Sequence, residues 1–229
     1  MIIILARESD AAARSFAARW GDGARVLCCA DIAQHRTAIA HPRIDDSTLT
    51  LEGRSFPITR VEGVLNLLPS IAAEELRFYP PEEREYQAAE FHALLLYLLS
   101  ALSCPVINRP TALSLNGPVF NPLGWYHLSS RVGIPLAPLL TRDGHLAPEF
   151  DSRDSELIEV AFLAGRLIRD SGTIADSYLL SLAKEARVQY LAARFWRKGP
   201  SDIRFVAANT IPDPRELVLQ AALLQVFNA

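Results

Sequence analysis

Lysine is nearly absent from this chain of 229 residues, which contains two lysines, Lys184 and Lys198, against 21 arginines. Glycine is sparse as well, and among the 11 glycines only Gly21 and Gly23 lie within three positions of each other. The two common phosphate-binding loops need several closely spaced glycines. The sequence therefore contains neither of these loops.

Long apolar runs and a charge excess are also missing. The most apolar stretch, residues 93–107, is shorter than the roughly 20 residues that span a bilayer and is interrupted by Pro105. The short apolar run at the N-terminus has no basic lead, which argues against a signal peptide. A net charge of −3 gives no basic excess for nucleic-acid phosphates. We expect a cytoplasmic protein that binds neither membranes nor nucleic acids.

Cysteine is limited to three residues, Cys28, Cys29 and Cys104. Their number is odd, and their spacing is not that of a metal site. If residues 24–31 form a strand, the adjacent thiols of Cys28 and Cys29 point to opposite faces of the sheet. This pattern favours a reduced protein with buried thiols and predicts no metal ligands among the cysteines.

The first 110 residues have the pattern of a parallel α/β lobe. Short apolar runs alternate with helical segments, and a hairpin is expected around Gly53. Asp10 is placed to cap the first helix, which Gly21 ends. A long helix at residues 80–102 is apolar on nearly all sides, so we expect it to be central. The expected strands lie at residues 2–6, 24–31, 63–68 and 104–108.

The remaining residues, 111–229, mix helices with an antiparallel pattern. A hairpin is expected at residues 157–172 with Ala164 and Gly165 at its turn. Residues 141–156 are polar and predict an irregular connection. The other expected elements are a helix from about residue 123, a helix from residue 176 or 177 to about 190, a strand at 203–209 and a final helix with Pro214 in its first turn.

Three stretches in this order resemble ATP-grasp ligases. Residues 104–138, "CPVINRPTALSLNGPVFNPLGWYHLSSRVGIPLAP", are similar to the segment in which a strand ends in V-I-N-x-P and a following helix closes with Gly-Ile-Pro. "EVAFLAGRLI" resembles a hairpin of that family, and residues 177–213 resemble its last module. The resemblance implies a parallel α/β lobe at 1–110 followed by a shortened ATP-grasp-like α+β lobe at 111–229. It also implies a relation to ATP-dependent carboxylate–amine ligases.

The residues that would carry the ligase chemistry differ from the family pattern. There, the final strand supplies a glutamate and an asparagine to two magnesium ions on the ATP phosphates. Aligned on Asn209, the glutamate position falls on Ala207. The aspartate of the preceding strand falls near Ala193 or Arg194, and the arginine of the hairpin falls on Glu159. Since Mg²⁺ needs hard oxygen ligands, the resemblance implies a protein without the usual metal site.

The lysines and the nucleotide lid of the family are missing too. One family lysine falls near Asn121 or Pro122. The lid and the adenine strand should lie between Pro138 and Glu159, where about 20 residues without lysine are available. Phosphoryl transfer depends on positioned cations and metals. We therefore expect a degenerate member of the family with no cofactor.

The expected function is binding without catalysis. The chain would act as a homodimer or as an accessory to another protein, with a small anionic ligand as a further option. The alternative is a minimal but active carboxylate–amine ligase that uses ATP and Mg²⁺, with Asp202, Asp213 or Glu216 as atypical metal ligands. A third option is an enzyme that does not use ATP and acts through His127 or His92.

Two basic positions are candidates for anion contact. Arg109 follows the strand at 104–108, where open parallel sheets commonly bind their ligands. Arg194 belongs to a basic and aromatic cluster with Trp196, Arg197 and Lys198. The second interpretation of this cluster is the ordinary surface of a hairpin.

Asn209 and Asp213 complete the candidate ligand residues. Asn209 is either a remnant metal ligand or, the interpretation we favour, a turn residue whose side chain binds the backbone two residues on. Asp213 precedes Pro214 and is either a catalytic acid or, again favoured, the cap of the last helix.

Overall fold

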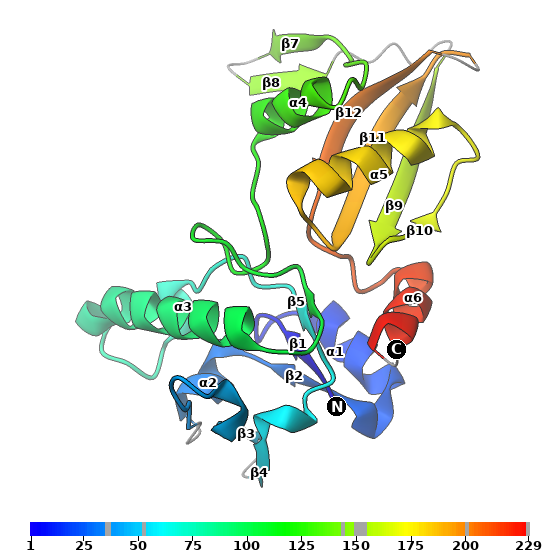
Figure 1. The fold of residues 1–229 in the computed structure, drawn as a ribbon. Helices are drawn as coiled ribbons and strands as arrows, with labels where there is room; N and C mark the ends of the chain where they lie inside the picture. Colours follow the sequence, from blue (N-terminus) through cyan, green and yellow to red (C-terminus); the bar gives the residue numbers. More distant parts are fainter. Residues whose placement is uncertain (35–37, 52–53, 143–144, 149–154, 200–201, 228–229) are drawn as a thin grey trace. The chain divides into compact units, whose positions relative to one another are not determined.

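A computed structural model of the chain describes residues 1–34, 38–51, 54–142, 145–148, 155–199 and 202–227 (Figure 1). The chain divides into two compact units. Unit 1 comprises Met1–Gly117 and Asp213–Ala229, and unit 2 comprises Pro118–Pro212. The division expected from the sequence lay at residue 110 and assigned the C-terminal helix to the second lobe. In the structure this helix belongs to unit 1.

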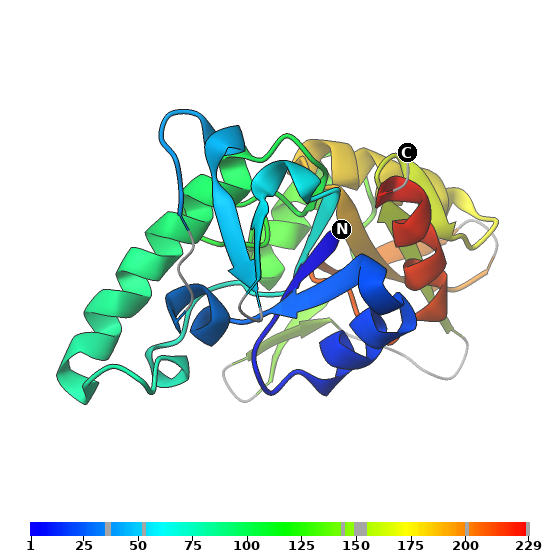
Figure 2. The same ribbon diagram turned by 90° about the horizontal axis from the view of Figure 1, so that it is seen from below.

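Unit 1 is built on a four-stranded parallel sheet with the strand order β2-β1-β5-β6. Figure 2 shows β1 and β2 side by side in this sheet. The central strands β1 and β5 are buried at every position, as parallel strands covered on both faces must be. The strands are β1 (Ile2–Leu5), β2 (Ala24–Leu27), β5 (Gly63–Asn66) and β6 (Val106–Ile107).

Helices and short turns surround this sheet. A separate antiparallel hairpin, β3 (Thr48–Leu51) and β4 (Arg54–Pro57), lies between β2 and β5 in the sequence. The α-helices are α1 (Ala11–Arg19), α2 (Cys29–Gln34), α3 (Arg84–Ala101) and α6 (Leu217–Phe227). The 3-10 turns are Gly21–Gly23, Ile44–Asp46, Ile58–Arg60, Ala73–Glu75 and Pro81–Glu83.

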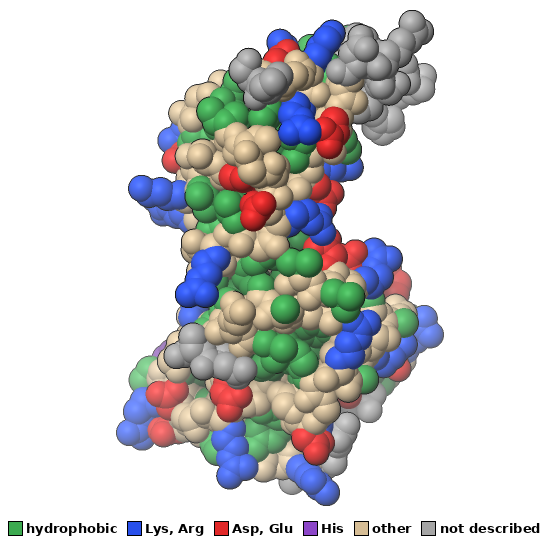
Figure 3. All heavy atoms as spheres, turned by 90° about the vertical axis from the view of Figure 1, so that its right-hand side faces the viewer, with side chains coloured by type: hydrophobic (Ala, Val, Ile, Leu, Met, Phe, Trp, Pro, Cys, Tyr) green, Lys and Arg blue, Asp and Glu red, His purple; other side chains and the backbone are tan. Residues whose placement is uncertain are grey.

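The C-terminal helix α6 explains why β5 begins with glycine. A Cβ atom added to Gly63 would lie 2.1 Å from Cδ1 of Phe227. The Phe227 ring also meets the Trp20 ring edge-on, with 6.2 Å between the ring centroids. Arg19 Nη1 donates a hydrogen bond of 2.7 Å to Gln220 Oε1, which joins α1 to α6. The last helix therefore packs directly against the parallel sheet, while exposed hydrophobic side chains remain on this side of the molecule (Figure 3).

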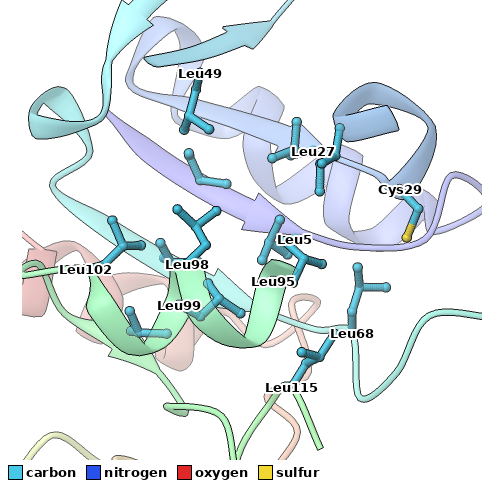
Figure 4. Close-up of a cluster of buried hydrophobic side chains, with 14 of the residues drawn as sticks. Leu5, Leu27, Cys29, Leu49, Leu68, Leu95, Leu98, Leu99, Leu102 and Leu115 are labelled. Carbon is cyan, nitrogen blue, oxygen red and sulfur yellow. The ribbon is translucent and has the colours of Figure 1, made fainter. Parts of the chain in front are cut away.

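Helix α3 provides the main core of unit 1. Its leucines Leu95, Leu98 and Leu99 pack with Leu5 and Leu27 of the sheet (Figure 4). The expectation that this helix is central is wrong in one respect, because only one stripe of it is buried. Tyr86 on the opposite side is 65% exposed.

Unit 2 contains a four-stranded antiparallel sheet with the order β10-β9-β11-β12. Helices α4 (Pro122–Arg131) and α5 (Ile174–Ala186) pack against one face, over a core centred on Phe195 and Phe205. A two-stranded hairpin is formed by β7 (Leu139–Arg142) and β8 (His145–Pro148). The strands of the main sheet are β9 (Glu156–Leu163), β10 (Arg166–Arg169), β11 (Tyr190–Arg197) and β12 (Ile203–Asn209).

Several local predictions are confirmed. Asp10 caps α1 by accepting a hydrogen bond of 2.9 Å from Ala13 N. The hairpin turn between β9 and β10 lies at Ala164 and Gly165, which both have positive φ angles, +47° and +91°. Strands β3 and β4 pair as the hairpin expected around Gly53, and Gly53 itself lies outside the described residues.

Other boundaries differ from the sequence-based expectation. Strand β2 ends at Leu27, and Cys29 begins α2, so the two thiols do not alternate along a strand. Helix α5 is capped by Thr173 rather than by residue 176 or 177, because the Thr173 hydroxyl accepts from Ala175 N. The same helix ends at Ala186, where Arg187 adopts a left-handed conformation with φ +56°.

Two further expectations fail at the loops. The expected irregular connection contains the β7–β8 hairpin, while residues 143–144 and 149–154 of it lie outside the described residues. Helix α6 begins at Leu217, so Pro214 precedes the helix instead of lying in its first turn. Within the described part of the chain, none of the helices combines the length and the apolar character needed to cross a membrane.

Candidate functional site

One face of the unit 2 sheet carries the positions at which the sequence pattern placed metal and phosphate contacts. It is the face opposite α4 and α5, and we call it the helix-free face. Register partners on antiparallel strands point to the same face. Several rows of side chains therefore cross it. Three of them are Arg169, Ala161, Ala192 and Asn209, then Glu159, Arg194 and Ala207, then Leu157, Trp196 and Arg204.

The middle row decides what this face can hold. Glu159, Arg194 and Ala207 are direct register partners on β9, β11 and β12. The Glu159 carboxylate forms an ion pair with Arg169. Arg194 is exposed, and no described residue forms an ion pair or hydrogen bond with its guanidinium. Mg²⁺ needs oxygen ligands, and neither the Ala207 methyl group nor the Arg194 guanidinium provides one. The Glu159 carboxylate already has a cationic partner.

This row therefore does not fit magnesium-bound ATP. Within residues 1–34, 38–51, 54–142, 145–148, 155–199 and 202–227, no group of three or more His, Cys, Asp or Glu side chains is placed to hold a metal ion. The guanidinium of Arg194 adds a positive charge where the resemblance implies an acid, and it would repel a divalent cation. The same charge is favourable for an anion.

Asn209 lies at the end of β12 and closes a local turn. Its Oδ1 accepts a hydrogen bond of 3.0 Å from Ile211 N, and its Nδ2 donates one of 3.1 Å to Ile211 O. These are the contacts of an asparagine that binds the backbone two residues on. The turn interpretation thus accounts for both polar atoms of this side chain, and a contact between Asn209 and a ligand stays a prediction.

The basic and aromatic cluster is divided between the two faces of the sheet. Trp196 lies on the helix-free face beside Arg204, whose Cζ is 5.7 Å from the centroid of the indole ring. Arg204 Nε also pairs with Asp202 Oδ1 at 2.8 Å. The neighbouring Arg197 has the opposite orientation and pairs with Glu156. Arg194 is consequently an exposed cation in the middle row of this face, and its guanidinium has no described partner.

Arg109 lies in unit 1 and binds main-chain oxygens. Its Nη1 donates to Leu99 O at 3.1 Å, and its Nη2 donates to Leu102 O and Cys104 O, each at 3.0 Å. These carbonyls belong to the end of α3 and to the segment that follows it. The guanidinium therefore fixes the chain between α3 and β6, and a contact between Arg109 and an anionic ligand stays a prediction.

Asp213 also lies in unit 1, four positions before α6 begins. Its Oδ1 accepts a hydrogen bond of 2.9 Å from Arg215 N, and its Oδ2 pairs with Arg215 Nη2 at 2.6 Å. The hydrogen bond from the Arg215 side chain lowers the pKa of Asp213. Asp213 thus closes the turn ahead of the helix. Of the four candidate ligand residues, Arg194 and Asn209 are in unit 2, whereas Arg109 and Asp213 are in unit 1.

Two hollows in unit 1 were not anticipated from the sequence. One has a volume of about 490 Å³ and lies where the chain leaves β1, β2 and β5. Arg7 Nε and Glu75 Oε1 form an ion pair of 3.0 Å beside it, and Cys29 Sγ lies 3.5 Å from Glu75 Oε2. Burial, followed by the negative charge of Glu75, raises the pKa of Cys29 to about 12, so this thiol is a poor nucleophile.

The second hollow, of about 540 Å³, shares Arg7, Glu8 and Cys28 with the first. It extends between α1 and the edge strand β2. The signal that could have located both hollows is the carboxyl edge of the parallel sheet. The carboxyl edge also led to the prediction of Arg109 after β6, whereas both hollows border the segments that follow β1 and β2.

Comparison with known proteins identifies the fold. No protein-family model and no curated protein matches this chain. The macrocyclase MdnC from Microcystis aeruginosa MRC, bound with precursor peptide MdnA, matches 100% of this chain and 99% of its own with a TM-score of 0.69. The chain has the ATP-grasp fold.

Two other solved ATP-grasp structures support this conclusion. The ATP-grasp ligase PsnB, complexed with minimal precursor, Mg and ADP, matches 100% of this chain and 98% of its own with a TM-score of 0.68. D-alanine-D-alanine ligase from Aeromonas hydrophila matches 100% of this chain and 94% of its own with a TM-score of 0.54. Sequence identities of 11%, 12% and 16% for the three matches mean that the fold is what is shared. The predicted fold class, a parallel α/β lobe followed by an ATP-grasp-like α+β lobe, is confirmed.

Proposed function

We propose that this chain is an ATP-grasp-fold protein that binds a ligand or a partner and has no ligase activity. The middle row of the helix-free face carries the proposal. Its residues, Glu159, Arg194 and Ala207, occupy positions at which the ATP-grasp pattern has an arginine, an aspartate and a glutamate. The hydrophobic core around Phe195 and Phe205 keeps the sheet in place without them.

A shortened lid agrees with this proposal. Only residues 132–155 separate α4 from β9, and the β7–β8 hairpin lies among them. That stretch contains no lysine. ATP-grasp chemistry needs positioned positive charge around the phosphates, since the protein contributes little covalent chemistry to phosphoryl transfer. A chain of this kind is better suited to holding a molecule than to activating one.

A peptide or protein is the partner that this proposal favours. MdnC was solved bound with a precursor peptide and PsnB with a minimal precursor, so similar folds do hold peptides. An accessory to a true ligase would use the same fold for binding alone. The chain would be a soluble cytoplasmic protein, consistent with its ordinary content of charged residues, 21%.

A homodimer remains part of the proposal. Helix α6 turns Leu217, Val218 and Leu224 outward, with exposed fractions of 71%, 51% and 40%. Residues 217–227 contain no charged side chain. Such a face can pair with a second copy, and sedimentation velocity at several concentrations would measure the association.

The second candidate is a minimal, active carboxylate–amine ligase that uses ATP and Mg²⁺. The match to ligases over nearly the whole of both chains favours it. It would need acids other than those of the family, such as Asp202, Asp213 or Glu216. Asp202 and Asp213 already pair with Arg204 and Arg215, which weakens their fitness as metal ligands.

Nucleotide titration separates the two candidates. We expect isothermal titration with ATP and Mg²⁺ at millimolar concentrations to show no binding, and the purified chain to hydrolyse no ATP. Asn209→Ala serves as the control for contaminating enzymes. Hydrolysis that is lost in Asn209→Ala would establish a ligase-type site and end the proposal.

Restoring the acids provides the converse experiment. The double variant Arg194→Asp with Ala207→Glu places two carboxylates on register partners. We expect it to bind Mn²⁺, followed by electron paramagnetic resonance, roughly tenfold or more tightly than the natural chain. Each single variant is a matched control, because one carboxylate is a poor site for a hard cation. Equal Mn²⁺ affinity of the natural chain and the double variant would contradict the proposal.

A further inference from the structure

Strand β2 is an unpaired edge of the unit 1 sheet. Among the described strands it pairs with β1 alone. Leu27 O accepts a hydrogen bond of 3.2 Å from Ala6 N, so the backbone groups of Leu27 point toward β1. Because these groups alternate along a strand, those of Ala24 and Val26 point away from β1. Arg25 Nη1 binds Ala24 O at 2.8 Å, which leaves Val26 N–H and C=O as a donor and an acceptor on the outer edge.

A groove runs along this edge. It is the hollow of about 540 Å³ that residues of α1 and β2 line. Ala17 and Ala18 of α1 and Ala24 and Val26 of β2 line it. These side chains are small and apolar, so an extended chain can approach the β2 backbone closely. At about 3.3 Å per residue, the four residues of β2 match a peptide segment of about the same length.

The charges around the groove favour an acidic side chain in that segment. Three arginines, Arg7, Arg14 and Arg25, and two acids, Glu8 and Asp31, line it. Most are already engaged. Arg7 pairs with Glu75, Arg25 pairs with Asp22, and Asp31 Oδ2 accepts from Cys28 N.

Arg14 is different from the other two arginines. Its guanidinium is exposed and donates to the main-chain oxygen of Glu8, but it forms no ion pair with a described residue. It is the cation of the groove that is available to a ligand carboxylate. Charge-assisted hydrogen bonds of this kind are stronger than neutral ones.

We propose that the groove between α1 and β2 binds an extended peptide segment, which adds to β2 as a further strand and places an acidic side chain on Arg14. One peptide residue exchanges two backbone hydrogen bonds with Val26, and small side chains of the peptide cover the exposed Ala18 and the half-buried Val26. The inference goes beyond the proposed function, which concerns the helix-free face of unit 2. A chain that hydrolysed ATP could still bind a peptide here, so either idea can fail alone.

The experiment uses the full chain, uniformly labelled with ¹⁵N, and an acetylated and amidated pentapeptide, Thr-Val-Glu-Val-Thr. We expect the amide signals of Ala24 and Val26 and of the neighbouring α1 residues to shift on titration, with saturation. Arg14→Gln should weaken binding roughly fivefold. Arg60→Gln, a change of an exposed arginine in the same unit, is the matched control and should bind the peptide as the natural chain does.

A second probe tests the strand hydrogen bonds without altering the protein. The same pentapeptide, N-methylated at the residues flanking its glutamate, keeps the side chains but loses backbone donors. We expect it to bind roughly fivefold or more weakly. Equal binding of the methylated and unmethylated peptides would overturn strand addition. Equal binding of a peptide with lysine in place of glutamate would overturn the role of Arg14.

Other occupants of the groove give different results. If glutarate alone shifted the same signals to the same extent at equal concentration, the groove would be a small-anion site and the proposal would be wrong. If the β2 amides were protected from hydrogen exchange only at concentrations where sedimentation shows a dimer, the occupant would be a second copy of β2. That result would also overturn the proposal.

Discussion

The two sheets of this protein differ in where they leave surface for binding a ligand or partner. The parallel sheet of unit 1 is covered on both faces, by α3 on one and by α1 and α6 on the other, and the two hollows lie at its carboxyl edge and along its edge strand β2. The antiparallel sheet of unit 2 has α4 and α5 on one face, and the opposite face carries exposed Arg194 beside buried Ala161. Parallel sheets are buried on both sides because of their crossover connections, whereas antiparallel sheets can leave one side free.

The chemistry of the two surfaces differs as well. The edge of unit 1 carries both charge signs around open hollows, including the Arg7–Glu75 pair. The helix-free face of unit 2 has alanines beside Arg194, where an ATP-grasp ligase would need acids. Both units thus keep the fold, and the two hollows of about 490 and 540 Å³ lie in unit 1.

The largest expected effect would come from the core of unit 2. Phe205 is fully buried, with its ring centroid 5.9 Å from that of Phe195 and 5.6 Å from that of Tyr126. Phe205→Ala should lower the free energy of unfolding by about 3–5 kcal/mol because it leaves a cavity. Hydrogen exchange followed by mass spectrometry should show faster exchange in β11 and unchanged exchange in β1. Equal acceleration in both strands would mean that the two units unfold as one.

A smaller effect is expected where α6 meets the parallel sheet. Gly63→Ala would push a methyl group into the Phe227 ring, and we expect unit 1 to lose about 2–3 kcal/mol in thermal unfolding. Gly23→Ala is the matched control, since an added Cβ there meets no atom within 4 Å. Adding Phe227→Ala to Gly63→Ala should relieve part of the loss. A melting temperature equal to that of the Gly23→Ala control would show that α6 does not hold the sheet as described.

The smallest expected effect is a loss of stability at high pH, and we expect it in unit 1 because the cysteines lie there. All three cysteines lie in unit 1. Burial raises the pKa of Cys29 from 9.0 to about 12 and that of Cys28 to about 11. The unfolded thiols therefore ionise first, and the stability of unit 1 should fall as the pH rises above about 9.

For Cys29 alone this loss amounts to about 1 kcal/mol at pH 10. Chemical denaturation between pH 8 and 10.5 would measure it. Cys29→Ala should flatten the decline in unit 1, and unit 2 should show no decline from this source. If the unfolding free energy of unit 1 fell with pH as steeply in Cys29→Ala as in the natural chain, burial would not raise the pKa of Cys29.

Local signals in the sequence gave reliable predictions. Asp10 was predicted as a helix cap and Ala164–Gly165 as a hairpin turn, and both are confirmed because these structures depend on a few adjacent residues. The resemblance to ATP-grasp ligases also held, since the order of strands, helices and turns is written along the chain.

Boundaries and partners were harder to predict. The apolar stripe of α5 continues in sequence beyond Ala186, but the left-handed Arg187 ends the helix and β11 follows. Periodicity alone could not show this, because the residues of a buried strand are as apolar as those of a buried helix. Arg109 was predicted at a ligand crevice, and its hydrogen bonds to the end of α3 depend on how the chain folds back on itself.

The sequence by itself determined that Ala207 stands two positions before Asn209, and that lysine and closely spaced glycines are nearly absent. Those facts fix which side chains are available, because chemistry cannot be supplied by residues that the chain does not contain. Only the tertiary structure decided which residues face each other. It aligned Ala207 with Arg194 and Glu159, and it left β2 unpaired at the edge of its sheet. Strand register and strand order arise from contacts between residues far apart in the chain, so they could not be read from one segment.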